Sequence, residues 1–360
     1  MKFTGNLVAI ASLLAFVRAH DEAPKTASQV EQYKRQQESI YHCAPQIALY
    51  NAARKRARRE QAQQVLSGQA PTDASTLFLE EAFAIPEKGE TKNLECKEAV
   101  VEPKIRNNTC VLSPETTQGP YYHDRGHPIR QNMAEYQLGL PWYMDVGVID
   151  VKTCKPLEGV LVDVWHANST GHYAGHPEQE EKLKWEGPKH EGPRKGLLSK
   201  YPRTEPEQTF LRAAWPTNKN GVSQYTSIFP GYYTGRATHV HVKVHTQWTP
   251  HANGTFTSSR LIHTGQFFVP DDINVSIDKI HPYTENPIKN KWGRTRNWED
   301  SLEIYQSSHA VRAKFSSPNG YGPTFDIEMV GGVIQQGLIG YITVGVDTTA
   351  SYNPTEAWSP

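Results

Sequence analysis

The chain has 360 residues, and its 38 Lys and Arg side chains are balanced by 38 Asp and Glu side chains, so the formal net charge is zero. Such a balance provides no electrostatic footprint for nucleic acid or for an anionic membrane, so neither is expected as a partner. A small neutral or singly charged partner suits the chain better.

The first 19 residues have the layout of a cleaved signal peptide. Lys2 precedes an apolar run at 7–17, which ends in the small-residue segment 17–19. The run is too short to span a bilayer, and no later apolar stretch of the sequence approaches the required length. We therefore expect a secreted, extracellular protein that begins near His20.

Cysteines and glycosylation motifs agree with secretion. An even count of widely spaced thiols in an oxidising compartment favours two disulfides in one of three connectivities, among Cys43, Cys96, Cys110 and Cys154. Metal binding by these thiols is the minor alternative, because no CxxC pair occurs. A glycoprotein is predicted from four sequons, which begin at Asn107, Asn168, Asn253 and Asn274.

Residues 20–105 are predicted to form a helical extension followed by a linker. The stretch 31–64 is rich in Gln, Glu, Arg, Lys and Ala, which favours one or two helices. Its basic cluster at 54–59 is interpreted as a solvated helix face, with a dibasic processing site or a partner patch as alternatives. The helices are open to three roles, as a homodimer interface, a lid or a brace.

Residues 106–350 are predicted to form a β-sandwich, and 351–360 a C-terminal tail. After Cys110, short β-rich runs alternate with turns, which is typical of all-β sandwiches. The predicted fold class is therefore mainly β, with an N-terminal helical extension.

Five segments of this region carry specific expectations. The runs 144–151 and 159–165 are predicted to pair as a hairpin. The segment 218–221 ends in Asn-Gly, which predicts a turn, and the run 342–347 is the final strand candidate. The charged, Pro-rich segment 177–206 is predicted to be a surface loop.

The segment 239–245 combines a strand pattern with two closely spaced histidines. Valines alternate with polar residues at the period of two expected of a strand, so His239 and His241 point the same way. Two such imidazoles can bind one ion of zinc, copper, nickel or iron. Without further context, however, a His-x-His pair is more often a plain surface or core pair.

Several separate motifs supply that context. They occur, in order, at 118–122, 165–173, 230–233, 236–241 and 264–268, with later ones at 282–286 and 337–344. Together these motifs resemble the intradiol ring-cleavage dioxygenases, in particular the secreted fungal branch. The resemblance covers about residues 113–347, and it implies an intradiol dioxygenase-like β-sandwich.

The resemblance implies a mononuclear, non-haem Fe(III) ion as cofactor. Carried over by motif, its ligands are Tyr173, Tyr233, His239 and His241. A phenolate is a hard anionic donor that stabilises Fe(III), and the charge of the metal in turn lowers the pKa of the phenol far below its free value near 10. Neutral imidazoles complete the set.

The implied reaction inserts both atoms of O2 into a catechol-type aromatic and cleaves the ring between the two hydroxyl-bearing carbons, giving cis,cis-muconate-type products. Tyr233 would leave the metal and help to take a proton from the substrate. Arg236 would stabilise negative charge on the ring, and Gln266 would lie near the oxygen and substrate site. Tyr121 and Tyr122 are expected to line the substrate pocket.

Some neighbouring residues have plainer interpretations. Tyr232 is adjacent to Tyr233, and a one-residue slip would exchange them, although Tyr233 is favoured. Trp165 is expected to pack in the core, and Asp163, on the same strand face, is expected to support the site. The sequon at Asn168 is expected to be buried, and structural roles are expected for His166, His172, His176 and His245.

Three alternatives differ in chemistry. An Fe(II) site with two histidines and a carboxylate is disfavoured, because residues 232–243 contain no Asp or Glu. A copper monooxygenase would use His20 as a new amino terminus, but this leaves Arg236, Gln266 and the tyrosine motifs unexplained. A secreted β-sandwich that binds a metal or an aromatic compound without turnover is the third alternative.

Overall fold

The computed structural model describes residues 41–66, 118–119, 121–123, 126–176, 207–290, 292–300, 305 and 323–352. The predictions that lie outside these residues concern the signal peptide, His20, Cys96, Cys110, Asn107 and the surface loop 177–206. The domain boundaries near residues 19, 105 and 350 stay predictions.

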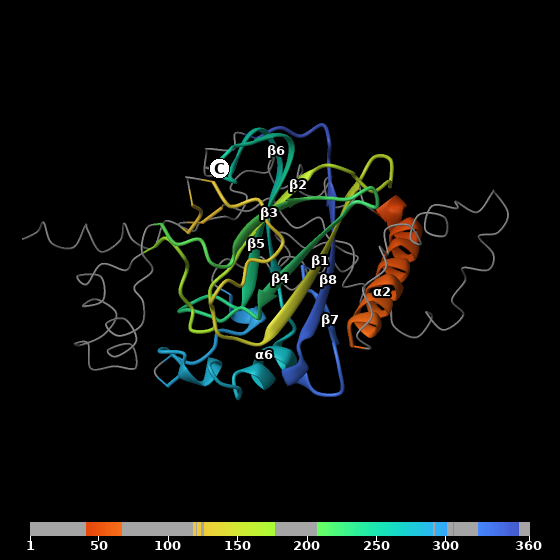
Figure 1. The fold of residues 1–360 in the computed structure, drawn as a ribbon. Helices are drawn as coiled ribbons and strands as arrows, with labels where there is room; N and C mark the ends of the chain where they lie inside the picture. The colour runs from red at the N-terminus through yellow and green to blue at the C-terminus, as the bar shows by residue number, and fades with distance from the viewer. Residues whose placement is uncertain are drawn as a thin grey trace, which may run out of the picture.

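The described residues form two four-stranded sheets packed face to face (Figure 1). In the first sheet the strands follow the order β4 (Val222–Ile228), β1 (Pro141–Asp150), β8 (Leu338–Val346) and β7 (Asp326–Met329). In the second sheet they follow the order β3 (Arg212–Pro216), β2 (Leu161–Trp165), β5 (His239–Pro250) and β6 (Phe256–Phe268). The pair β1–β8 is parallel, and the other pairs in the sheets are antiparallel.

The core lies between the sheets and follows from the period of two along the strands. Val240, Val242 and Val244 of β5 are fully buried in the same apolar cluster as Val146 of β1 and Val344 of β8. Burial of these side chains drives the two sheets together. The mainly β, sandwich fold class predicted from the sequence is therefore confirmed.

The predicted hairpin of 144–151 with 159–165 is wrong. β1 belongs to the first sheet and pairs with β4 and β8, whereas β2 belongs to the second sheet and pairs with β3 and β5. The intervening residues cross from one sheet to the other. Each strand buries an inner face against the opposite sheet, which places β1 in one sheet and β2 in the other. Local alternation of side chains does not specify which strands pair.

Other local expectations are confirmed. Gly221 has a φ of +69° and closes a turn in which its N–H donates to the carbonyl of Asn218 at 2.8 Å. This turn also crosses between sheets, from β3 to β4. The final strand candidate is β8, and the His-x-His segment begins β5.

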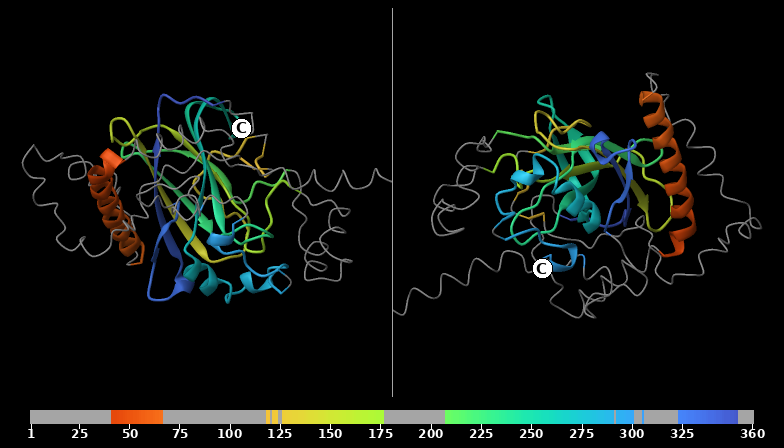
Figure 2. Two further views of the ribbon diagram at one scale, coloured as in Figure 1. Left: turned by 180° about the vertical axis from the view of Figure 1, so that it is seen from behind. Right: turned by 90° about the horizontal axis from the view of Figure 1, so that it is seen from below.

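The helix α2 (Ala44–Leu66) follows a 3-10 turn, η2 (Tyr41–Cys43), and covers the outer face of the first sheet beside β8 and β7 (Figure 2). Ile47 and Tyr50 lie about one helical turn apart and are buried against the sheet. The helix approaches so closely that a Cβ at Gly147 of β1 would overlap the side chains of Tyr50 and Arg54. A glycine at this position therefore permits the contact.

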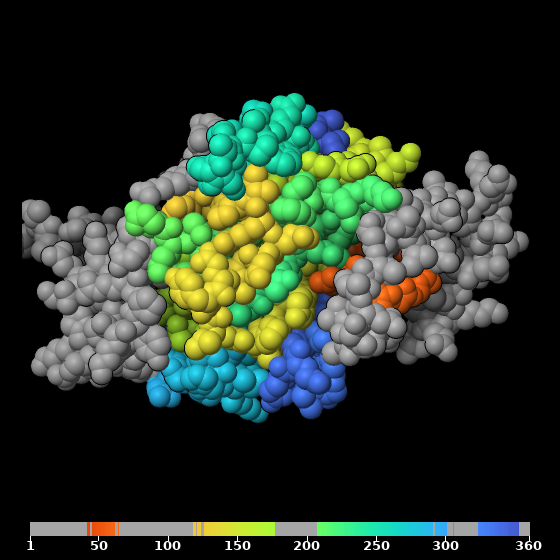
Figure 3. Space-filling model, viewed as in Figure 1, coloured from red at the N-terminus to blue at the C-terminus, as the bar shows by residue number. Residues whose placement is uncertain are grey.

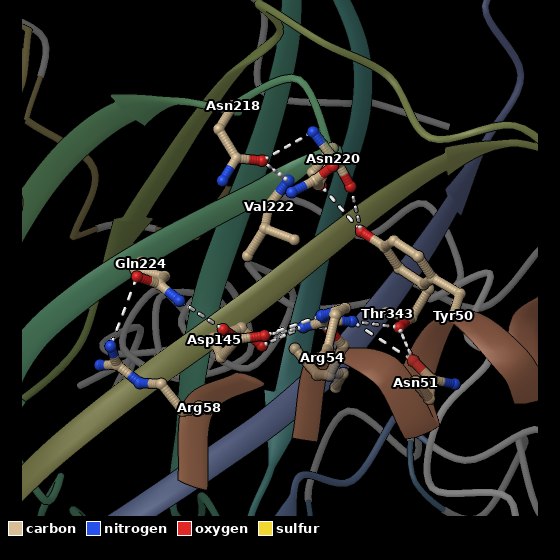
Figure 4. A network of polar contacts seen from close by, with 12 residues as sticks. Tyr50, Asn51, Arg54, Arg58, Asp145, Asn218, Asn220, Val222, Gln224 and Thr343 are labelled. Atoms are coloured by element: carbon tan, nitrogen blue, oxygen red, sulfur yellow. Dashed lines mark hydrogen bonds and ion pairs between the residues drawn. The ribbon is translucent and has the colours of Figure 1, made fainter. Parts of the chain in front are cut away.

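Arg54 is the polar centre of this contact (Figure 4). Its Nε donates to Oδ1 of Asp145 at 2.8 Å, and its Nη1 donates to Oγ1 of Thr343 at 2.6 Å. Arg54 is only 3% exposed, and Nη2 also donates to the Asp145 carboxylate and to the carbonyls of Asp145 and Ile342. The charged pair is thus enclosed between helix and sheet.

The prediction of a solvated basic face at 54–59 is therefore wrong at Arg54. Two further cations of the cluster meet carboxylates of β7, in the pairs Lys55–Asp326 and Arg59–Glu328. These carboxylates lie far away in the sequence, so a local charge pattern could not show that they compensate the cluster. Within the described residues there is one α-helix in this region, and it braces the sandwich.

A disulfide between Cys43 and Cys154 ties the start of α2 to the β1–β2 crossing. Of the three connectivities left open by the sequence, this pairing excludes two. Closing a chain loop with a sequence separation of 111 restricts the unfolded chain strongly, so the link stabilises the docked helix.

The remaining described helices are short, namely α6 (Asp271–Ile277), η5 (Tyr283–Glu285), η6 (Asn297–Glu299) and η7 (Ile334–Gln336). In the space-filling view, residues near 126–150 cross the middle of one face, between the β5–β6 hairpin tip and the segment that begins with α6 (Figure 3). No helix in the described ranges is long and apolar enough to cross a membrane.

Candidate metal centre and active site

His239 and His241 lie on the face of β5 that points away from the sandwich core. Their Nε2 atoms are 3.1 Å apart, and both residues are buried. The Nδ1 of His239 donates to the carbonyl of Ala237 at 2.7 Å, which leaves the Nε2 lone pair available for a metal. This end of β5 therefore presents two buried imidazoles side by side on its outer face.

Tyr173 reaches this pair from the loop after β2. Its phenol oxygen is 3.4 Å from Nε2 of His239 and 3.2 Å from Nε2 of His241. The loop is held by Asn168, whose Oδ1 accepts hydrogen bonds from the backbone N–H of Thr170 and of His172. The side-chain amide of Asn168 also donates to Gln137, but Asn168 is only half-buried, so the expected burial of this sequon holds only in part.

Tyr233 comes from the segment after β4. Gly231 donates its N–H to the carbonyl of Asn168 at 3.0 Å, and a Cβ at Gly231 would overlap that carbonyl, so the two tyrosine loops touch. The phenol oxygen of Tyr233 is 3.3 Å from Nε2 of His239. The ring of Tyr232 instead lies beneath the guanidinium of Arg294, 4.1 Å from its Cζ. The structure therefore brings Tyr233, and not Tyr232, to the histidines.

The four side chains have the spacing of a metal site. Donor atoms bound at about 2.0–2.1 Å to one tetrahedrally disposed ion lie about 3 Å apart. The distances measured from Nε2 of His239 to its three neighbours are 3.1, 3.3 and 3.4 Å. Two phenols and two imidazoles fit a single ion, and phenolate oxygen is a donor that suits a hard, highly charged cation.

Burial dictates how these groups titrate in the metal-free chain. It raises the pKa of Tyr173 well above its usual value, and the neighbouring Tyr233 adds to this. It lowers the pKa of His239 and His241 well below their usual value, helped by the charge of Arg236. The site thus holds neutral imidazoles, and its phenols need a cation in order to ionise.

Arg236 and Gln266 lie together at the edge of this cluster. Nη2 of Arg236 donates to Oε1 of Gln266, which is paired across β5–β6 with His241. Burial raises the pKa of Tyr233, but the charge of Arg236 and a hydrogen bond from it act in the opposite direction. Tyr233 is only partly buried, whereas Tyr173 is 4% exposed, so Tyr233 is the more accessible of the two phenols.

Solved structures with a similar fold exist, whereas no protein-family model and no curated protein matches the chain. The chain is 24% identical to an intradiol ring-cleavage dioxygenase from Tetranychus urticae, with a TM-score of 0.48, covering 68% of this chain and 98% of that one. It is 19% identical to catechol 1,2-dioxygenase from Pseudomonas arvilla C-1, with a TM-score of 0.37, covering 69% and 65%.

A third structure is the dioxygenase domain of a carbohydrate-binding fusion protein from Streptomyces sp. SirexAA-E, at 21% identity and a TM-score of 0.37, covering 65% of this chain and 97% of that one. The matched structures include members of the family that the motifs resemble. At these low similarities the likeness does not decide the chemistry, and the site residues carry the functional proposal.

Tyr121 and Tyr122 lie on one side of the site. The ring of Tyr121 stacks on Tyr173 and also meets Tyr233 edge to face, at a centroid distance of 5.7 Å. Tyr122 points the other way, and its hydroxyl donates to Oδ2 of Asp163 at 2.9 Å. Tyr121 therefore lies against both phenols, whereas Tyr122 anchors the segment to the sheet.

Trp165 was expected in the core and Asp163 was expected to support the site, and the structure modifies both expectations. Trp165 is fully buried, but on the outer face of the sheet, where its ring stacks on His241 at 4.7 Å. Asp163 touches none of the four clustered side chains through a direct hydrogen bond. It accepts a hydrogen bond from Nδ1 of His127 at 2.5 Å, and Nε2 of His127 lies 3.1 Å from Nη1 of Arg212.

Arg212 links this network back to the site. It donates to the carbonyl of Ala174, next to Tyr173, at 2.7 Å, and its guanidinium lies 6.0 Å from the Tyr173 ring. Arg212 and His127 were not singled out from the sequence, since neither lies in a recognised motif. Asp163 thus supports the site through them, and not by contact.

The additional histidines have structural contacts. His166 hydrogen-bonds Ser227 and the carbonyl of Ala167, and Nδ1 of His245 lies 2.9 Å from Oγ of Ser258. His172 meets Thr170 in its own loop. The ring of His176 packs edge-on against Tyr121 at 5.5 Å. Each of these four side chains is thus held by contacts of a structural kind, as expected.

Proposed function

We propose that the protein is an Fe(III)-dependent intradiol dioxygenase that acts on catechol-type aromatics and O2. The single observation that supports this most is the convergence of two phenol oxygens on Nε2 of His239, beside the Nε2 of His241. Tyrosinate pairs favour a ferric ion over the zinc or copper that imidazoles alone would accept. The names of the matched structures agree with this reaction.

The proposed ligands are Tyr173, Tyr233, His239 and His241. Bound there, Fe(III) would supply the Lewis acidity that favours an ionised catechol oxygen. Tyr173 is held under Tyr121, and the histidines are held by the strand, so these three form the fixed part. Tyr233 is the least enclosed phenol, and it would take a proton from the incoming catechol.

Arg236 and Gln266 would act on the substrate. The guanidinium lies beside Tyr233 and is fully charged, because the carboxylate of Asp300 overcomes burial and keeps the pKa of Arg236 above its usual value. A fixed cation at this place stabilises negative charge on the ring as it develops. Gln266, held by Arg236, would present its amide to the oxygen and substrate side.

The test combines iron content, the visible spectrum and oxygen uptake against a panel of catechols. Tyrosinate bound to Fe(III) absorbs visible light and colours the protein burgundy, whereas zinc and type-2 copper sites do not. Y233F should lose most of the turnover and alter the band. Y232F is the matched control, because the ring of Tyr232 lies under Arg294, outside the cluster.

Three results would count against the proposal or against the role that it gives to Tyr233. A purified protein that takes up no iron would favour binding without a ferric centre. Iron uptake with unchanged catechol turnover in Y233F would remove the assigned role of Tyr233. Colour with no oxygen uptake on any catechol would favour a binding protein without turnover.

We also propose that the protein is secreted as a glycoprotein. Support comes from the signal-peptide layout of residues 1–19 and from the Cys43–Cys154 disulfide, which suits an oxidising compartment. Asn253 lies on an exposed turn and can carry a glycan, but Asn274 is fully buried and donates to Val269. Protein from culture medium should begin at residue 20 and carry a glycan at Asn253 and none at Asn274; a retained Met1 would contradict secretion.

A further inference from the structure

Asp300 lies outside every motif that the sequence analysis singled out, yet its carboxylate is enclosed beside the site. Its side chain has no exposed surface, and its two oxygens lie 3.1 and 3.3 Å from Nε of Arg236. One of these oxygens also accepts the backbone N–H of Ala237 at 2.8 Å. The carboxylate therefore holds both the side chain of Arg236 and the backbone that follows it.

Asp300 is itself placed by contacts to the end of β6. It directly follows η6, in which the side-chain amide of Asn297 donates to the carbonyl of Val269 at 2.8 Å. The backbone N–H of Asn297 donates to the carboxylate of Asp271, at the start of α6. These contacts fix the position of residue 300 relative to Gln266, which lies three residues before Val269 on the same chain segment.

The two partners of Arg236 occupy different edges of its guanidinium. Nε donates to Asp300, and Nη2 donates to Gln266, so the plane of the group is set by two contacts. A guanidinium has five N–H donors, and those that remain can face Tyr233 and a substrate beside it. Without the Asp300 contact, the Arg236 side chain would have many more accessible rotamers. The preceding residue, Gly235, has a φ of +80° and no side chain, so it does not hold Arg236 in place.

We propose that Asp300 is a positioning residue, which acts through Arg236 by fixing its guanidinium against Tyr233 and the substrate. The catalytic effect of Asp300 rests on the proposed function, whereas the pairing of Asp300 with Arg236 is independent of it. Asp300 hydrogen-bonds the side chain of Arg236 and the backbone N–H of Ala237.

The test is a double-mutant cycle with D300N, R236Q and the double variant, in iron-loaded protein with catechol. D300N keeps the size of the side chain but loses the charge and one acceptor. We expect kcat/KM to fall about 100-fold, mostly through kcat, because a misplaced group near the reacting atoms costs about that much. In the double variant the loss should be no greater than in R236Q alone.

The matched control is D272N. Asp272 is a nearby exposed carboxylate on α6, and its replacement should leave kcat, KM and the visible band as in the wild type. Iron content should also be unchanged in D300N, because Asp300 acts through Arg236 and is not one of the proposed ligands. A purely structural role would instead lower iron content and kcat together.

A second readout does not depend on iron or turnover. Urea unfolding of the four metal-free proteins should show that the effects of D300N and R236Q are not additive, as expected for partners in contact. Additive effects on both unfolding and kcat/KM would overturn the inference, and so would wild-type kinetics in D300N. If the wild type binds iron but turns over no catechol, the proposed function fails, and the unfolding cycle still decides whether the pair exists.

Discussion

The phenol ring of Tyr121 lies flat on the ring of Tyr173, with centroids 4.5 Å apart and planes 7° apart. The stack covers one face of a proposed iron ligand and joins the segment at 121–123 to the site. Stacked aromatic pairs contribute about 0.5–1.5 kcal/mol beyond their buried area.

The first prediction concerns this stack. Y121A should weaken iron retention about three- to tenfold, because a loss near 1 kcal/mol changes an equilibrium by that factor. The measurement is the fraction of iron that remains after incubation with graded chelator. Y121F keeps the stacked ring and should retain iron like the wild type; equal loss in both variants would show that the hydroxyl, and not the stack, matters.

The second prediction concerns acid stability. Burial lowers the pKa of His166 to about 4, from an ordinary value near 6.5 in the unfolded chain. Between these pH values the unfolded chain binds more protons, so the free energy of unfolding falls as the pH drops from 6.5 towards 4. The shift corresponds to roughly 3 kcal/mol at the acid end.

Urea unfolding from pH 7 to pH 4.5 measures this effect. H166Q should reduce the slope of stability against pH without abolishing it, because the pKa of His127 is also lowered to about 4 by burial. H251Q, at an exposed position, is the control and should keep the wild-type slope. A wild-type slope in H166Q would contradict the assignment.

The third prediction compares two arginines of α2. R54M should lower the free energy of unfolding by about 3–5 kcal/mol, because it leaves the carboxylate of Asp145 buried without its partner. R59M should lower it by at most about 1 kcal/mol, because Arg59 pairs with Glu328 at the surface. Chemical denaturation of both variants checks this, and equal losses would show that the Arg54 pair is not enclosed.

The fourth prediction concerns substrate charge. Arg236 is already paired with the carboxylate of Asp300, and Arg294 with that of Asp278, so a substrate carboxylate finds the charge of both arginines compensated. Catechol should therefore have a higher kcat/KM than 3,4-dihydroxybenzoate. In D300N this ratio should shift about tenfold towards the acid, because the charge of Arg236 is no longer compensated. A preference of the wild type for the acid would contradict the prediction.

Much of the site could be predicted because its parts are local. The donor types of Tyr173, Tyr233, His239 and His241 can be read from short motifs, and the period of two along β5 puts its histidines on one face. The sequence already favours Tyr233 over Tyr232, and the structure adds the reason that Tyr232 points elsewhere, which is its contact with Arg294, about 60 positions away along the chain.

What the sequence by itself determined are features set within a few residues: strand alternation, the Asn-Gly turn, the helical composition of 31–64 and the chemistry of the motifs. What only the tertiary structure decided are long-range pairings: β1 and β2 lie in different sheets, Arg54 is buried on Asp145, and Asp300 holds Arg236. The physical reason is that sheet pairing joins strands far apart in the sequence, and buried charge compensation joins residues 91 or 64 positions apart; no local period records either.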